Sequence, residues 1–162
     1  MKAERIFLKL FPIFLVLLIV SSKTVGQDAA NDEEASAMLK KLETKNFVFV
    51  AQTAMPQRGT SRHLTSNYDL RVSNDSLTCN LPYFGRAYSA PMDASSGGIN
   101  FVSTSFDYTV KPKKKNSWDV VMKPKDKKDV QQLLLNVFSS GSAYLQVTSN
   151  NRQPMSFNGN VK

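Results

Sequence analysis

Hydrophobic and polar positions follow a helical period in residues 27–46 and a strand period afterwards. Four apolar residues of the first part recur at helical spacing and form one narrow stripe: Ala35, Met38, Leu39 and Leu42. Acidic residues precede this stripe and lysines follow it, an order that complements the helix dipole. We therefore predict a tail and one short amphipathic helix over residues 27–46.

From Phe47 onward, apolar and polar residues alternate in short runs separated by turn-forming residues. Eight runs are predicted to be strands: 47–54, 68–73, 76–83, 99–112, 118–123, 130–138, 143–147 and 155–161. Because most connections are short, consecutive strands are expected to pair. The predicted fold is mainly β: a single domain, residues 47–162, in which an eight-stranded antiparallel meander forms a flattened barrel or a sandwich.

The long run from Ile99 to Pro112 changes face along its length. Its apolar side chains occupy odd positions up to Phe101 and even positions from Phe106 onward. The alternation switches across residues 103–105. A bulge or a sharp bend produces such a switch, so we predict a barrel corner, or a passage between packed sheets, at this point.

The first 26 residues have the three parts of a secretory signal peptide. Basic residues come first, an apolar run follows from Leu10 to Val20, and small residues lead to Gly26. We predict cleavage after Gly26, with a cut near Ala30 as the alternative, and a periplasmic or extracellular protein without a membrane span after processing. An uncleaved membrane anchor is the competing interpretation.

Few residues of this chain suit catalysis or metal binding. Cys79 is the single cysteine, so no disulfide forms within the chain, and its place between Leu77 and Leu81 predicts a buried apolar role. His63 is the single histidine, lies in a polar stretch and has no partner pattern for a hydrolase or a zinc site. We predict no metal, no cofactor and no catalytic residue.

The net charge of the chain does not single out one class of partner. The precursor has a net charge of +8; the signal segment holds four basic residues and one acidic residue, so the mature chain would carry +5. This charge suits an anionic partner but also ordinary solubility, and an exported protein is not expected to bind nucleic acid. The lysine runs 113–115 and 125–128 flank one predicted strand, at opposite ends of the sheet, and are interpreted as solvated turns.

Loop lengths indicate where binding is expected. In a meander, connections alternate between the two ends of the sheet, and the long ones (55–67, 84–98, 124–129 and 150–154) all fall at one end, the long-loop end. The candidate ligand-binding residues are Arg62, Tyr83, Phe84, Arg86, Tyr88 and Arg152. Arginines there would bind a carboxylate or phosphate, and aromatic rings would stack on an apolar part. Alternatively, the aromatic residues plug this end, and Arg86 hydrogen-bonds loop carbonyls.

Several segments resemble one known family. They are LPYFGRAYSAP (Leu81–Pro91), GGINF (Gly97–Phe101), LTSNYDLRV (Leu64–Val72), SGSAYLQVTSNNRQ (Ser140–Gln153) and SFNGNV (Ser156–Val161). Together they are similar to domain-of-unknown-function family 4251, small exported proteins mainly of Bacteroidetes. The resemblance implies an envelope location and a compact β-rich fold. It brings no assigned activity, so no catalytic residue is carried over.

The sequence thus favours an exported, non-enzymatic binding module that takes an unknown small or anionic ligand, or an envelope protein, at its long-loop end. One alternative is a carboxylate-dependent hydrolase, since Asp69, Asp107 and Asp119 are interior to predicted strands. Another is a structural or assembly factor that acts through edge strands or the N-terminal helix.

Overall fold

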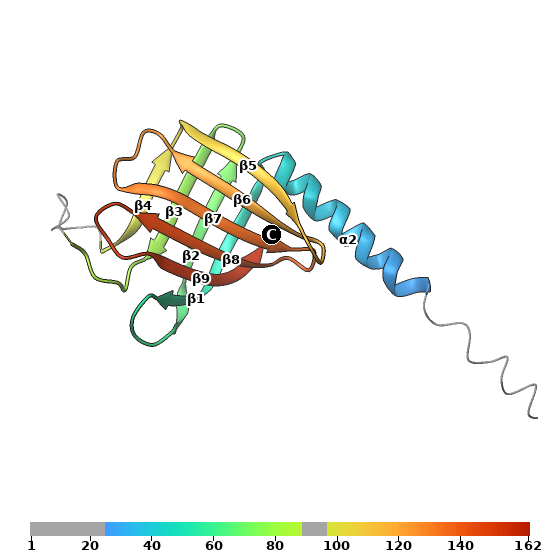
Figure 1. The fold of residues 1–162 in the computed structure, drawn as a ribbon, viewed down its shortest axis with the longest axis horizontal. Coiled ribbons are helices and arrows are strands. Elements are labelled where there is room, and N and C mark those ends of the chain that lie inside the picture. Colours follow the sequence, from blue (N-terminus) through green and yellow to red (C-terminus); the bar gives the residue numbers. More distant parts are fainter. Residues whose placement is uncertain (1–24, 89–96) are drawn as a thin grey trace, which may run out of the picture. The chain divides into compact units, whose positions relative to one another are not determined.

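The computed structural model describes residues 25–88 and 97–162 of the chain (Figure 1). All but the end of the predicted signal peptide lies outside the described residues, as does the middle of the predicted long loop 84–98. The chain divides into a unit that ends at Glu33 and a second unit, Glu34–Lys162, which contains every described strand.

The helix α2 runs from Val25 to Glu43. It therefore includes residues for which the sequence predicts a tail. Its apolar stripe is confirmed: Met38 and Leu42 are buried in the core, and the other two members pack against it. The last turn is also joined to a strand, because the Tyr108 hydroxyl donates a hydrogen bond to the carbonyl oxygen of Leu42 at 2.7 Å. Burial raises the pKa of that tyrosine.

The described residues contain nine strands in one antiparallel sheet. They are β1 (Phe47–Pro56), β2 (Arg62–Ser73), β3 (Ser76–Pro82), β4 (Gly98–Ser103), β5 (Phe106–Lys113), β6 (Ser117–Pro124), β7 (Val130–Phe138), β8 (Ser142–Ser149) and β9 (Met155–Val161). The order β4-β3-β2-β1-β9-β8-β7-β6-β5 makes β1 and β9 neighbours, and Figure 1 shows β6–β8 crossing in front of β2 and β3. The predicted mainly β, barrel-like meander is confirmed.

The barrel is nearly closed, and its opening lies between β4 and β5. These two strands are the edges of the sheet: β4 pairs with β3, and β5 pairs with β6. We call the place where their free edges are unpaired the seam. The single strand predicted over residues 99–112 is thus two strands, which is why the structure has nine strands and not eight.

The corner between β4 and β5 falls at the predicted change of face. Ser103, the last residue of β4, is fully buried, and its hydroxyl donates a hydrogen bond to the carboxylate of Asp126 in the β6–β7 loop. The backbone N–H of Thr104 donates to the other oxygen of the same carboxylate at 3.3 Å. The backbone N–H of Lys125 in turn donates to the carbonyl oxygen of Ser105 at 2.8 Å. One loop therefore holds the bend in place.

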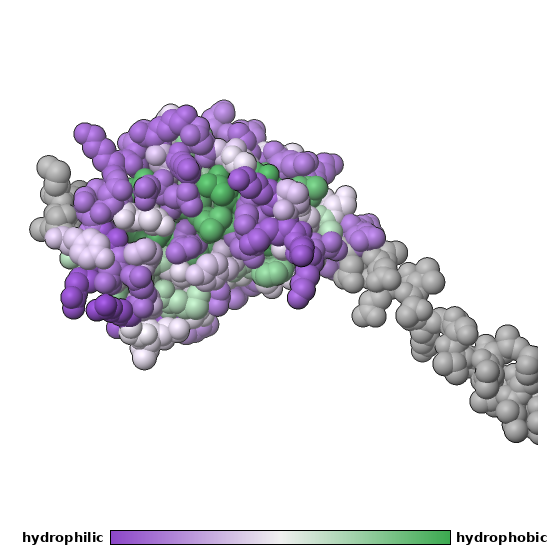
Figure 2. Space-filling model, viewed as in Figure 1, coloured by the Kyte–Doolittle hydropathy of each residue, from purple (hydrophilic) through white to green (hydrophobic). Residues whose placement is uncertain are grey.

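Inward-facing side chains of all strands fill the barrel, and most are buried. Half-buried exceptions lie beside the seam, at Phe101, Phe106, Tyr108 and Val110, and in the first part of β2, at Leu64 and Tyr68. Cys79 is buried as predicted, and burial raises the pKa of its thiol. The outer face shown in Figure 2 is largely hydrophilic, with a small apolar area near its centre.

The first predicted long loop is shorter than expected. Strand β2 begins at Arg62, so His63 is an exposed strand residue paired with Thr53, and not a loop residue. The β1–β2 connection is reduced to residues 57–61. Local alternation around His63 is weak because residues 62–67 are exposed apart from the half-buried Leu64, so a period of two is absent from the sequence.

Candidate functional site

The segment Tyr83–Tyr88 lies against the β8–β9 loop at the long-loop end of the barrel. Ala87 and Arg152 form an isolated antiparallel bridge. Next to it, the N–H of Tyr88 donates to the carbonyl oxygen of Asn151 at 2.8 Å, and the N–H of Gln153 donates to that of Arg86 at 3.0 Å. Two segments about 65 residues apart in the sequence are therefore joined by backbone hydrogen bonds.

The Tyr83 side chain also connects the two segments of this junction. Its half-buried hydroxyl lies 2.8 Å from the carbonyl oxygen of Arg86 and 3.2 Å from that of Gln153, and it donates to both. Burial raises the pKa of the phenol, although the hydrogen bond to Gln153 and the charge of Arg152 oppose this rise. A Cβ at Gly85 would lie 2.6 Å from the Tyr83 hydroxyl, so any other residue here would displace the Tyr83 ring.

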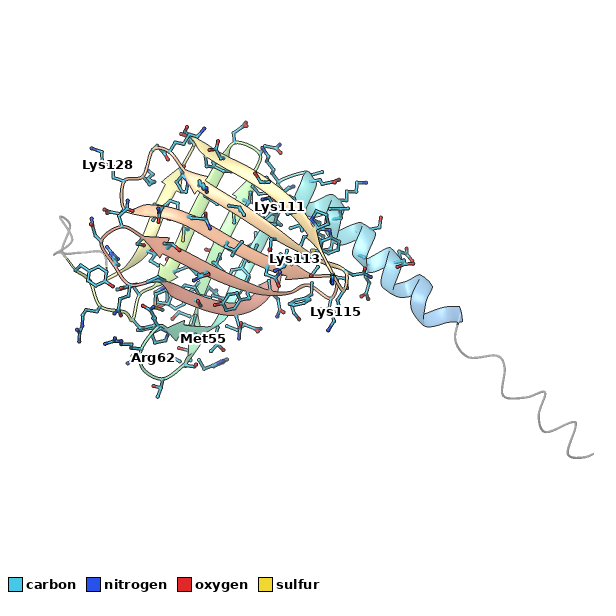
Figure 3. All side chains as sticks on the ribbon, viewed as in Figure 1. Met55, Arg62, Lys111, Lys113, Lys115 and Lys128 are labelled. Atoms are coloured by element: carbon cyan, nitrogen blue, oxygen red, sulfur yellow. The ribbon has the colours of Figure 1, made fainter. Side chains whose placement is uncertain are left out.

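Two arginines lie over aromatic rings at this end. The guanidinium of Arg152 is 5.4 Å from the ring centre of Tyr83, and its Nη1 donates to the carbonyl oxygen of Gly98 at 2.8 Å. The guanidinium of Arg62, labelled in Figure 3, is 4.8 Å from the ring centre of Phe84. Both distances suit cation–π attraction. Four of the six predicted site residues are thus in two contacting pairs.

The other two predicted residues hold their positions through the backbone. Arg86 is exposed, and its N–H and carbonyl groups, not its guanidinium, contact Gln153. Tyr88 is 67% exposed, so it does not plug the barrel. The alternative of an aromatic plug therefore describes Tyr83 and Phe84, which pack against the core, but not Tyr88.

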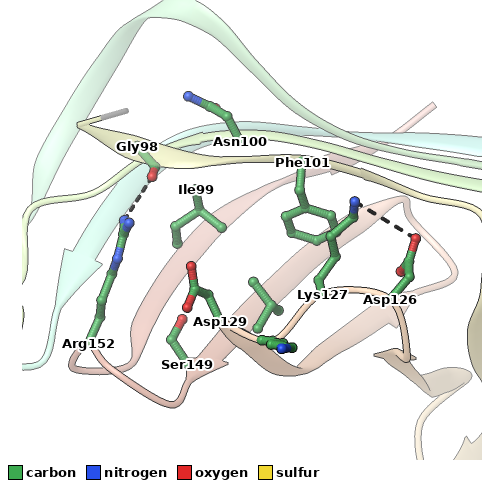
Figure 4. A pocket seen from close by; sticks show the side chains of 11 residues that line it. Gly98, Ile99, Asn100, Phe101, Asp126, Lys127, Asp129, Ser149 and Arg152 are labelled. Atoms are coloured by element: carbon green, nitrogen blue, oxygen red, sulfur yellow. Dashed lines mark hydrogen bonds and ion pairs between the residues drawn. The ribbon is translucent and has the colours of Figure 1, made fainter. Parts of the chain in front are cut away.

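A pocket of about 320 Å³ opens beside this junction, where the seam meets the long-loop end (Figure 4). We call it the seam pocket. Its apolar wall is made by the inward-facing Ile99, Phe101 and Val130. The rest of the lining is formed by Gly98, Asn100, Asp126, Lys127, Lys128, Asp129, Ser149 and Arg152. It combines one edge strand with the ends of β7 and β8 and two loops.

Most polar side chains of the seam pocket already have a partner. Lys127 Nζ lies 3.8 Å from a carboxylate oxygen of Asp126, whose pKa is lowered, chiefly by the hydrogen bond from Ser103. Asp129 accepts a hydrogen bond from the Asn151 side chain at 3.3 Å. Lys127, Lys128 and Arg152 outnumber the two aspartates. The pocket therefore has an excess of positive charge beside an apolar wall.

Sequence reasoning found Arg152 but not the rest of this pocket. Lys127 and Lys128 were placed at the correct end, yet their run was interpreted as a solvated turn. Ser149 and Asp129 adjoin ends of strands that face the long-loop end, which was the available signal. The contribution of β4 was not predictable, because it depends on the unpaired edge created by the corner at residues 103–105.

The three strand carboxylates of the hydrolase alternative lie in separate ion pairs. Asp69 pairs with Arg71 at 3.3 Å. Asp107 pairs with Lys125 at 2.6 Å, and Asp119 pairs with Lys113 at 3.1 Å. Their strand positions alternate with inward-facing residues, so all three lie on the outer face. Within residues 25–88 and 97–162, no group of three or more His, Cys, Asp or Glu side chains is arranged to hold a metal ion.

Among the described residues, no helix combines the length and apolar character needed to cross a membrane. The fold and the pocket together define a small antiparallel β-barrel that is open along one seam. The last turns of its own helix α2 pack against the barrel core.

The chain belongs to the DUF4251 family, described as a domain of unknown function: the family model matches residues 29–161. A crystal structure of a DUF4251 family protein from Bacteroides eggerthii DSM 20697 has the same fold. The similarity has a TM-score of 0.61 and 19% sequence identity, and it covers 82% of this chain and 89% of that chain. A search of curated proteins found no significant match.

Proposed function

We propose that the protein is exported and that it binds a small anionic ligand in the seam pocket without chemically changing it. The observation that carries this proposal is the position of the pocket. It lies where the barrel interior opens at the unpaired edge of β4, and it is lined by an apolar wall and three basic side chains. Barrel mouths and the loops around them are common sites of ligand binding.

The lining indicates the chemistry of the ligand. A carboxylate, sulfonate or phosphate would bind Arg152, which uses Nη1 for Gly98 and has further N–H donors. The two lysines at the rim would add to this attraction. An apolar part of the ligand would pack on Ile99 and Phe101. The Ser149 hydroxyl would donate or accept hydrogen bonds with its polar groups, and the Asp129 carboxylate would accept them.

The proposal moves the binding site away from part of the predicted set. Tyr83 and Phe84 pack against the core, and the guanidiniums of Arg152 and Arg62 lie over their respective rings. Of the six predicted residues, Arg152 alone lines the seam pocket, and the other five stand outside its lining: Arg62, Tyr83, Phe84, Arg86 and Tyr88. A hydrolase is less well supported, because the three strand carboxylates are paired separately with basic residues on the outer face.

The binding test uses 8-anilinonaphthalene-1-sulfonate, an aromatic sulfonate whose fluorescence rises in an apolar site. We expect saturable binding at one site. Ser149→Trp fills the pocket and should weaken binding at least about tenfold, equivalent to about 1.4 kcal/mol. Ser140→Trp is the matched control, since Ser140 is an exposed turn residue between β7 and β8.

A second variant removes charge and keeps the packing. Lys127→Gln combined with Lys128→Gln should also weaken the binding of the dye. Dye binding that is not saturable, or that is unchanged in both pocket variants, would contradict the proposal. Native mass spectrometry of the protein purified from its own envelope then identifies a retained ligand, and the protein mass tests whether the mature chain begins near Gln27.

A further inference from the structure

We propose that the outer face of the β5–β6 hairpin is a second binding surface, for a linear acidic polysaccharide. This surface adjoins the seam pocket and shares Lys128 with it, but the groove on the hairpin has a different lining. Six lysines lie along the hairpin and its flanking turns and form what we call the lysine stripe: Lys111, Lys113, Lys115, Lys123, Lys125 and Lys128. Figure 3 shows Lys111, Lys113 and Lys115 toward one end of the hairpin and Lys128 toward the other.

Two lysines on the strands of the hairpin lie between the lysine runs of its two flanking turns. The runs 113–115 and 125–128 do lie at opposite ends of β6, as predicted. Lys111 and Lys123 stand between them, exposed on the outer face. In the β5–β6 ladder, Asp119 is the cross-strand neighbour of Lys111, and Asp107 is that of Lys123. Lysines therefore occur along the whole hairpin and not only in its two flanking turns, although these two lysines have aspartates as their cross-strand neighbours.

Only part of this charge is neutralised. Asp107 pairs with Lys125 at 2.6 Å, and Asp119 pairs with Lys113 at 3.1 Å. Lys111, Lys115, Lys123 and Lys128 have no ion pair with any residue in the described ranges. The six lysines outnumber the two aspartates of this face, and such an excess of cations attracts an anionic polymer.

A shallow groove runs between Lys111 and Lys123. It has a volume of about 290 Å³ and a floor that contains Thr109 and Val121, with Asp107 at one side. An apolar side chain and a hydroxyl suit the C–H face and the hydroxyl groups of a sugar ring, while the lysines suit its carboxylates or sulfates. The groove thus adds a contact for the neutral part of the polymer.

The shape and composition of the stripe favour a polysaccharide over two other anionic partners. Strand β6 has eight residues and spans about 27 Å, so the stripe is long and narrow, whereas a lipid surface needs a broad contact with inserted apolar side chains. The groove lining contains no aromatic side chain. Single-stranded nucleic acid binds through stacking on such rings.

The test compares two variants with the same change in net charge. The stripe variant is Lys111→Gln, Lys115→Gln and Lys123→Gln. The control variant is Lys40→Gln, Arg58→Gln and Lys162→Gln, three exposed basic residues elsewhere. Binding to immobilised polygalacturonate and to heparin is measured over a range of salt concentrations. We expect the stripe variant to lose at least about tenfold in affinity and the control less than about threefold, with a shallower salt dependence only in the stripe variant.

Equal losses in the two variants would show a nonspecific charge effect and overturn the proposal. So would failure of the wild type to bind either polysaccharide, or tighter binding to phosphatidylglycerol vesicles or to oligo-dT. The Ser149→Trp variant should bind polygalacturonate as the wild type does, because the stripe variant and the pocket variant change different surfaces.

Discussion

Tyr83 and Arg152 show how a side chain expected to bind a ligand also holds the structure that surrounds the ligand. The Tyr83 hydroxyl lies between two backbone carbonyls, and Arg152 connects the β8–β9 loop to the start of β4. Sequence reasoning brought these two residues together because aromatic and basic residues gather in loops at one end. It could not show that Arg86 contacts Gln153 through its own backbone N–H and carbonyl groups, because the residue type does not tell which of its groups forms hydrogen bonds.

At the residue scale, Gly85→Ala tests the brace. The added Cβ lies 2.6 Å from the Tyr83 hydroxyl, so the ring must move and its two hydrogen bonds are lost. We expect the free energy of unfolding to fall by about 1–3 kcal/mol, measured by urea denaturation. Gly97→Ala is the control, because an added Cβ there meets nothing within 4 Å. Similar stabilities of the two variants would show that Tyr83 does not brace the loop.

At the scale of elements, the corner between β4 and β5 was predictable in part. The change of face across residues 103–105 is written in the apolar pattern, because successive side chains of a strand point to opposite faces. The pattern does not tell which strands the two halves pair with. That choice depends on hydrogen bonds to β3 and β6, and it creates both the seam and the pocket.

The pH dependence of stability tests the corner. Hydrogen bonds from Ser103 and Thr104 lower the pKa of Asp126 below its unfolded value of 3.8. The ionised carboxylate therefore stabilises the fold above about pH 3.8, and this contribution is lost as pH falls through the lower folded pKa. We expect the melting temperature of the wild type to fall more steeply below that pH than that of Asp126→Asn.

Asp75→Asn serves as the control for this comparison, because Asp75 is an exposed residue of the β2–β3 turn. Its melting temperature should follow that of the wild type across the same pH range. Parallel curves for the wild type and Asp126→Asn would mean that the carboxylate does not hold the corner.

At the scale of the whole molecule, alternation and short connections were sufficient to predict a mainly β meander. The pairing of β1 with β9 was not predictable from local pattern, since it joins strands from the two ends of the domain. The inward-facing apolar side chains on both are buried, which is compatible with a barrel and with a sandwich alike. The observed hydrogen bonding of β1 to β9 distinguishes the barrel from the sandwich.

The single thiol reports on the integrity of the whole barrel. Cys79 is buried, and burial raises the pKa of its thiol. We expect the native protein at pH 8 to react with 5,5′-dithiobis(2-nitrobenzoic acid) far more slowly than the urea-unfolded protein. A reducing agent should leave the melting temperature unchanged. Rapid labelling of the native protein, or a disulfide-linked dimer, would contradict this expectation.

The pairing of β1 with β9 also limits how early the barrel can form during synthesis of the chain. Met55 and Asn158, which contact each other across this pair, are 103 residues apart, so a growing chain holds an unpaired β1 edge until residues 155–161 have been synthesised. Contacts between such distant residues form slowly. The barrel therefore closes only after nearly the whole chain has been synthesised.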